Sequence, residues 1–134
     1  MQRRALLLLA AVVVAVPAAS AATAPTKLHA RLASVAPAAG GSGVFIANAV
    51  ERKNVVQLDW RLSVAHLSGP VTAVNLRIGG AHTMVLPLCK PCGSRGKVGL
   101  VSGLWKQISG GRSAIVVSTR AHPKGEVRGT LTVG

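Results

Sequence analysis

Hydrophobic and polar residues alternate along several short segments of this chain, and glycine or proline separates one segment from the next. Between Gln57 and Val64 every second side chain is apolar, and the side chains between them are polar or charged. The stretch from Val71 to Ile78 alternates in largely the same way. A period of two places successive side chains on opposite faces, which is typical of antiparallel strands that bury one face.

Segments of this kind recur along most of the chain and predict about eight short strands. Because each strand hides only one face, two sheets must stack, and the pattern predicts an all-β, antiparallel two-sheet β-sandwich of immunoglobulin-like or Greek-key type. Residues 102–108 are expected to form a turn of helix, too short to make a layer. Turn residues predict hairpins at Ser68-Gly69-Pro70 and around Pro123-Lys124-Gly125. The predicted strands are residues 28–32, 43–50, 57–64, 71–78, 83–88, 97–101, 113–119 and 126–133.

The N-terminus has the features of a signal peptide. Arg3 and Arg4 precede an apolar run from Ala5 to Val16, Pro17 breaks the run, and Ala19-Ser20-Ala21 offers small residues for cleavage. The run is shorter than the ~20 apolar residues that a membrane span needs. We therefore predict a signal peptide at residues 1–21, a disordered lead-in at 22–26 and one domain at 27–134, secreted or associated with the cell envelope. An uncleaved anchor is the alternative.

The balance of basic and acidic residues indicates the sign of the charge that a binding partner would carry. The chain has 16 basic and 3 acidic residues, and its net charge is +13. Such a surface attracts anionic polymers, although a merely solvated surface is the alternative. Nucleic acid is not expected, because an exported chain with one Phe, two Trp and no Tyr has few rings to stack on bases. The candidate anion-binding residues, all predicted on the polar faces of strands, are Arg61, Arg77, Arg120 and Arg128.

Cys89-Lys90-Pro91-Cys92 is the one short motif with reactive potential. In an oxidising compartment a disulfide between Cys89 and Cys92 is the simplest expectation. A redox site would need a thioredoxin-like βαβ context, and a zinc site would need a second ligand pair. The sequence pattern supplies neither, so a redox site and a zinc site remain as alternatives to the disulfide.

Catalytic chemistry has little support in the sequence. The four histidines, His29, His66, His82 and His122, have no ligand-like spacing, and His122 is expected in an exposed loop. Asp59 and Glu126 are predicted on polar strand faces, as ordinary solvated carboxylates. No Gly-x-Ser-x-Gly nucleophile motif is present. We therefore predict no catalytic residues, no metal site and no cofactor.

Three stretches resemble the chordin (CHRD) domain family: residues 58–62, residues 66–73 and residues 118–129. The similarity runs from about Lys27 to Val133, and Pro123 to Gly129 is its most specific part. The resemblance implies an extracellular β-sandwich module of the secreted microbial type, with a poorly defined biochemical role. The positions that match the family motif are Gly69, Pro70, Pro123, Gly125, Glu126, Arg128 and Gly129.

The chain also departs from the family pattern. Positions that commonly hold histidines in the family correspond here to Asn75, Arg77 and Ser118, so a metal or proton-transfer function is not carried over. Glu126 and Arg128 are two apart on a predicted strand and are expected to share a face and fix the last hairpin.

These observations favour a non-catalytic secreted or envelope module that binds an anionic polymer or a protein partner. A metal-dependent or redox-active β-sandwich enzyme and a purely structural envelope protein are the alternatives.

Overall fold

The computed structural model describes residues 24–35, 40–79, 83–89 and 93–134. The signal peptide predicted at residues 1–21 lies outside these ranges and stays a prediction. The lead-in predicted at residues 22–26 is wrong at its last residue, because Thr26 already belongs to the first strand.

The described residues form nine strands and one short helix. The elements are β1 (Thr26–Ser34), β2 (Ser42–Arg52), β3 (Val55–Ala65), β4 (Val71–Ile78), β5 (Met84–Cys89), β6 (Arg95–Val101), α1 (Ser102–Ser109), β7 (Ser113–Thr119), β8 (Val127–Thr130) and β9 (Thr132–Val133). Each predicted strand and the short helix are confirmed, except that the last strand is divided into β8 and β9. Between them the Leu131 side chain turns into the core, and its N–H donates a 3.0 Å hydrogen bond to the Ser113 carbonyl.

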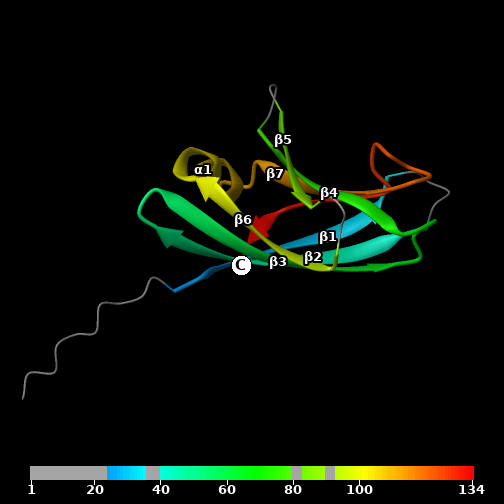
Figure 1. Cartoon of the computed structure of the whole chain (residues 1–134), viewed down its shortest axis with the longest axis horizontal. Coiled ribbons are helices and arrows are strands. Elements are labelled where there is room, and N and C mark those ends of the chain that lie inside the picture. Colours follow the sequence, from blue (N-terminus) through cyan, green and yellow to red (C-terminus); the bar gives the residue numbers. More distant parts are fainter. Residues whose placement is uncertain (1–23, 36–39, 80–82, 90–92) are drawn as a thin grey trace, which may run out of the picture.

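All strands belong to one antiparallel sheet with the order β5-β4-β7-β8-β1-β2-β3-β6, and β9 pairs with β1 beside β8. Figure 1 shows β4, β5 and β7 on one side and β1, β2, β3 and β6 on the other. The edge strands β5 and β6 come near each other without a shared ladder in the described part of the chain, so the sheet curls almost into a barrel.

The all-β antiparallel class is therefore confirmed, whereas two separate stacked sheets are not found. The reason is β8, which pairs with β7 through Ala114 to Val117 and with β1 through Ala33 and Ser34. By pairing on both sides, this strand joins the two halves into one hydrogen-bonded surface.

The inward side chains of the curled sheet make one core. In β3 the alternation predicted from the sequence holds, because Leu58 and Trp60 are buried while Arg61 is exposed. The Trp60 ring stacks on Phe45 with 5.8 Å between ring centroids. Trp105 and Ile108 of α1 join the same core, and α1 lies at one end between the two sides of the sheet (Figure 1).

The predicted hairpin at Ser68-Gly69-Pro70 is wrong. β3 pairs with β2 and β6, and β4 pairs with β5 and β7, so these three residues carry the chain from one side of the curled sheet to the other. The hairpin around Pro123-Lys124-Gly125 is confirmed, because it joins the paired strands β7 and β8. Segments with proline and glycine thus form a crossing between the two sides of the sheet in one place and a hairpin in the other.

Among the described residues no helix has the length and apolar character needed to cross a bilayer.

Candidate anion-binding surfaces

The outer face of β1, β2, β3 and β6 carries a group of exposed basic side chains that we call the basic face. Residues paired across neighbouring strands point to the same side of a sheet, so the register shows which side chains lie together. Arg61 of β3 pairs with Arg95 of β6 on one side and with Ile46 of β2 on the other. The basic face is made of Lys27, His29, Arg31, Arg61, Arg95 and Lys97, all exposed.

A second cross-strand row lies next to the first, and it runs from Lys27 through Asn48 and Asp59 to Lys97. An open hollow of about 730 Å³ covers the parts of both rows that belong to β2, β3 and β6, and it is lined in part by Arg61, Arg95 and Lys97. The exposed side chain of Ile46 also lines this hollow. The basic face therefore combines several cations with an apolar patch at its middle.

Asp59 is the one carboxylate on the basic face in the described part of the chain. It is half-buried, and its Oδ1 atom has no hydrogen-bond partner among the described residues. Of the other two acids, Glu51 is exposed near the end of β2 and Glu126 is buried elsewhere. The charge of the basic face is therefore strongly positive.

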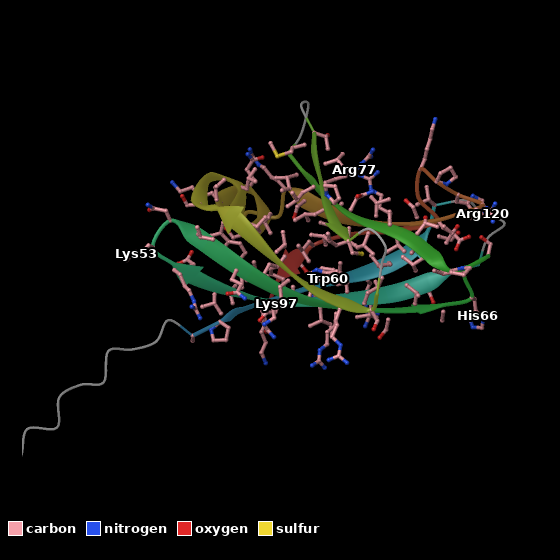
Figure 2. The ribbon with its side chains drawn as sticks, in the orientation of Figure 1. Lys53, Trp60, His66, Arg77, Lys97 and Arg120 are labelled. Carbon is pink, nitrogen blue, oxygen red and sulfur yellow. The ribbon has the colours of Figure 1, made fainter. Side chains whose placement is uncertain are left out.

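A second cationic group, which we call the arginine pocket, is built by Arg77, Arg112 and Arg128. These side chains belong to β4, to the segment before β7 and to β8, and they line a hollow of about 190 Å³. Arg77 pairs across the sheet with Ala114 of β7, and Ala114 pairs with Thr130 of β8. Arg77 and Lys97 lie on opposite sides of the molecule in Figure 2, so the pocket and the basic face are separate.

The four arginines predicted from the sequence are thus divided among three places. Arg61 lies on the basic face, Arg77 and Arg128 line the arginine pocket, and Arg120 is exposed just after β7, at the end of the molecule that also holds His66 (Figure 2). Arg112 was not among the predicted residues, because it lies between the expected helix turn at residues 102–108 and the expected strand at 113–119. Only the pairing of β7 between β4 and β8 brings it to the other two.

Glu126 is fully buried, and its carboxylate contacts Ser68 and His122. Its two carboxylate oxygens each accept a hydrogen bond of 3.1 Å from the Ser68 backbone N–H, and the Ser68 hydroxyl donates to Oε1. The His122 Nε2 atom lies 3.6 Å from Oε1. Ser68 is part of the crossing between β3 and β4, so Glu126 ties that crossing to the β7–β8 hairpin.

The hydrogen bond from the Ser68 side chain is the main reason why the pKa of Glu126 is below its ordinary value. Burial acts in the opposite direction, and the Ser68 N–H, His122 and Thr119 lower the pKa further. The expectation that Glu126 is an ordinary solvated carboxylate is therefore wrong. So is the expectation that it shares a face with Arg128, because Glu126 precedes β8 and is buried while Arg128 is exposed.

The Ser68, Glu126 and His122 side chains do not have the order of a nucleophilic triad. In a triad the histidine lies between the serine and the carboxylate and takes the serine proton. Here the carboxylate lies between the other two, and the serine hydroxyl donates to it directly. These hydrogen bonds fix the backbone of Ser68 against Glu126.

The positions that hold histidines in the CHRD pattern lie on the outer face of β4 and β7. Asn75 and Arg77 pair with Val116 and Ala114, and Ser118 pairs with Ala73 beside Asn75. In the described ranges no three His, Cys, Asp or Glu side chains gather as a metal site. His82 and Cys92 lie outside the described residues, so the Cys89–Cys92 disulfide stays a prediction. Cys89 itself is the last residue of β5 and packs against the core.

No protein-family model, no curated protein and no solved structure matches this chain. The resemblance to the CHRD family is therefore a resemblance of motifs.

Proposed function

We propose that this protein is a non-catalytic, CHRD-like module, secreted or held in the cell envelope, that binds an anionic polymer through its basic face. The observation that carries the proposal is the gathering of cations from β1, β3 and β6 on one face of the sheet, where Asp59 is the single carboxylate among the described side chains of that face.

The shape of the basic face favours an extended ligand. Neighbouring strands are about 4.8 Å apart, so the cations of β1, β3 and β6 extend over roughly 14 Å across the sheet, with uncharged side chains of β2 between β1 and β3. Rows of side chains repeat about every 7 Å along the strands, because alternate residues share a face. A polymer with regularly spaced anionic groups can contact several of these cations at once, whereas a small ligand contacts only a few.

The apolar side chains on the same face suit the uncharged part of a polymer. Ile46 and Val44 are 50% and 43% exposed, and each has a cationic neighbour across the strand pair. Contact with the polymer would remove their apolar surface from water, which adds a favourable term that salt does not screen. Binding should therefore weaken steeply with salt without vanishing.

The export part of the proposal rests on residues 1–21 alone. Mass spectrometry of the protein from its producer should find a mature N-terminus after Ala21. A full-length chain would contradict cleavage.

A matched pair of triple variants tests the basic face. The first variant is Arg61→Gln/Arg95→Gln/Lys97→Gln, and the second is Lys53→Gln/Lys106→Gln/Lys124→Gln, which removes the same charge at exposed positions elsewhere. The probe is fluorescent poly-L-glutamate, and binding is followed by anisotropy at two salt concentrations.

We expect the first variant to bind about tenfold more weakly, since each lost exposed ion pair contributes ~0.2–1 kcal/mol. The second variant should stay near the parent protein. Equal losses in both variants would mean that net charge alone attracts the polymer, and the proposal would then be wrong.

A further inference from the structure

We infer that the arginine pocket is a second, independent binding site, which takes a single tetrahedral oxyanion such as a phosphate group. The site lies away from the basic face and uses different residues, so it goes beyond the polymer binding proposed above.

The first argument is the convergence of three arginines from three segments of the chain. Arg77 on β4 and Arg128 on β8 flank β7, and Arg112 directly precedes β7. The residue of β7 between Arg77 and Thr130 is Ala114, whose small side chain leaves space above the strand. The hollow of about 190 Å³ has room for one oxyanion group.

The second argument is charge. In the described part of the chain the one ion pair is between His122 and Glu126, so none of the three arginines contacts a carboxylate. Three guanidinium groups around one hollow repel each other unless an anion lies between them. The structure thus has three cations gathered at one place with no protein anion to balance them.

The third argument is that the backbone beneath Arg112 is fixed. Its N–H donates a 2.9 Å hydrogen bond to the Gln107 carbonyl, and its carbonyl accepts a 2.9 Å hydrogen bond from the Gly79 N–H at the end of β4. Gly111, with φ of +80°, provides the turn that brings this residue to the sheet. Because Arg77 and Arg128 stand on strands, all three side chains start from ordered positions.

The chemistry of the donors selects the class of ligand. Each guanidinium offers a planar pair of N–H groups that matches two oxygens of a phosphate or carboxylate. One arginine can already satisfy both oxygens of a carboxylate, whereas three arginines match the oxygens of a tetrahedral group. Thr130 also lines the pocket, and a threonine hydroxyl can donate a further hydrogen bond.

Inorganic phosphate is the first probe, with backbone amide NMR shifts as the readout at constant ionic strength. We expect saturable shifts, one phosphate per chain, centred on Gly79, Ala114, Arg128 and Thr130. Arg112→Gln should weaken binding at least tenfold, and Arg112→Lys should weaken it less, because lysine keeps the charge and loses the paired N–H groups.

Arg61→Gln is the matched control, since it removes one positive charge from the basic face. It should leave phosphate binding unchanged. Equal weakening by Arg61→Gln and Arg112→Gln, shifts spread over all basic residues, or no saturable shift would each overturn the site.

Glycerol phosphate distinguishes the two sources of the oxyanion. Tighter binding than inorganic phosphate supports a phosphate group carried on a larger molecule, and equal binding supports free phosphate. The polyglutamate assay separates the two proposals, because Arg112→Gln should retain polymer binding even if the phosphate site fails.

Discussion

The Glu126 carboxylate accepts hydrogen bonds from both the backbone N–H and the hydroxyl of Ser68, a residue 58 positions earlier in the chain. The Glu126 carbonyl accepts a 2.9 Å hydrogen bond from the Val35 N–H, and the Glu126 N–H donates to the Val117 carbonyl. One residue therefore connects the end of β1, the crossing after β3 and the last hairpin. Loss of the carboxylate should therefore free the crossing at Ser68 from the last hairpin, whereas the backbone bonds to Val35 and Val117 remain.

Glu126→Gln should destabilise the fold, because both carboxylate oxygens accept hydrogen bonds from Ser68 and the NH₂ group of an amide cannot accept one. We expect the melting temperature to fall by several degrees in a thermal unfolding experiment followed by circular dichroism. Ser68→Ala removes one donor and keeps the backbone N–H, so its melting temperature should fall less. An unchanged melting temperature in Glu126→Gln would show that the contacts with Ser68 contribute little.

Glu126 should also make the fold acid-sensitive. Its pKa is lowered in the folded protein, so the stabilisation is present above the ordinary value of 4.5 and is lost as pH falls through that value toward the folded pKa. Chemical unfolding at a series of pH values should show this loss on the acid side. The Glu126→Gln variant should give a flatter curve there, and a slope equal to the parent's would contradict the assignment.

Gly129 is the motif glycine whose substitution should be most harmful. A Cβ atom at this position would lie 2.1 Å from the Arg31 carbonyl oxygen, where β8 meets β1. Since backbone must shift to relieve the clash, Gly129→Ala should lower the free energy of unfolding by about 3 kcal/mol or more. Chemical denaturation measures the change.

Gly69→Ala is the control for that substitution. A Cβ atom at Gly69 meets nothing within 4 Å, so the variant should keep nearly the parent stability. Equal losses in the two variants would mean that contact with β1 is not the reason for the glycine at 129.

Asp59→Asn should strengthen polymer binding, because it removes the carboxylate from the middle of the basic face with little change in shape. One exposed charge corresponds to roughly a two- to fivefold change in affinity for polyglutamate. Glu51→Gln changes the charge by the same amount away from the hollow over the basic face, and it should have a smaller effect. A larger effect of Glu51→Gln would place the polymer elsewhere.

The sequence predicted the strands well because alternation is a local property. In β3 and β4 the polarity of a side chain indicates which face of the sheet it lies on. The prediction that Arg61 and Arg77 lie on the outer face is therefore confirmed. What alternation cannot report is which strands are neighbours. The turn residues at Ser68-Gly69-Pro70 fit a hairpin and a crossing equally well, and only the pairing of β3 with β6 decides between them.

The candidate site was partly predictable for the same reason. The arginines on strands were found, whereas Arg112 joins Arg77 and Arg128 only through the order of β4, β7 and β8 in the sheet. The burial of Glu126 was missed because its donors come from Ser68, far away in sequence. A charged residue next to a strand gives no local sign that distant N–H and O–H groups will enclose it.

The position of β1 in the sheet has a consequence for how the chain acquires its shape. β1 pairs with β2 on one side, but on its other side it pairs with β8 and β9, near the opposite terminus. A chain that emerges from its N-terminus onward thus carries an unsatisfied strand edge until residue 133 is available. We therefore expect completion of the sheet to be a late step that depends on distant segments meeting, with the open edge of β1 able to pair with other chains until then.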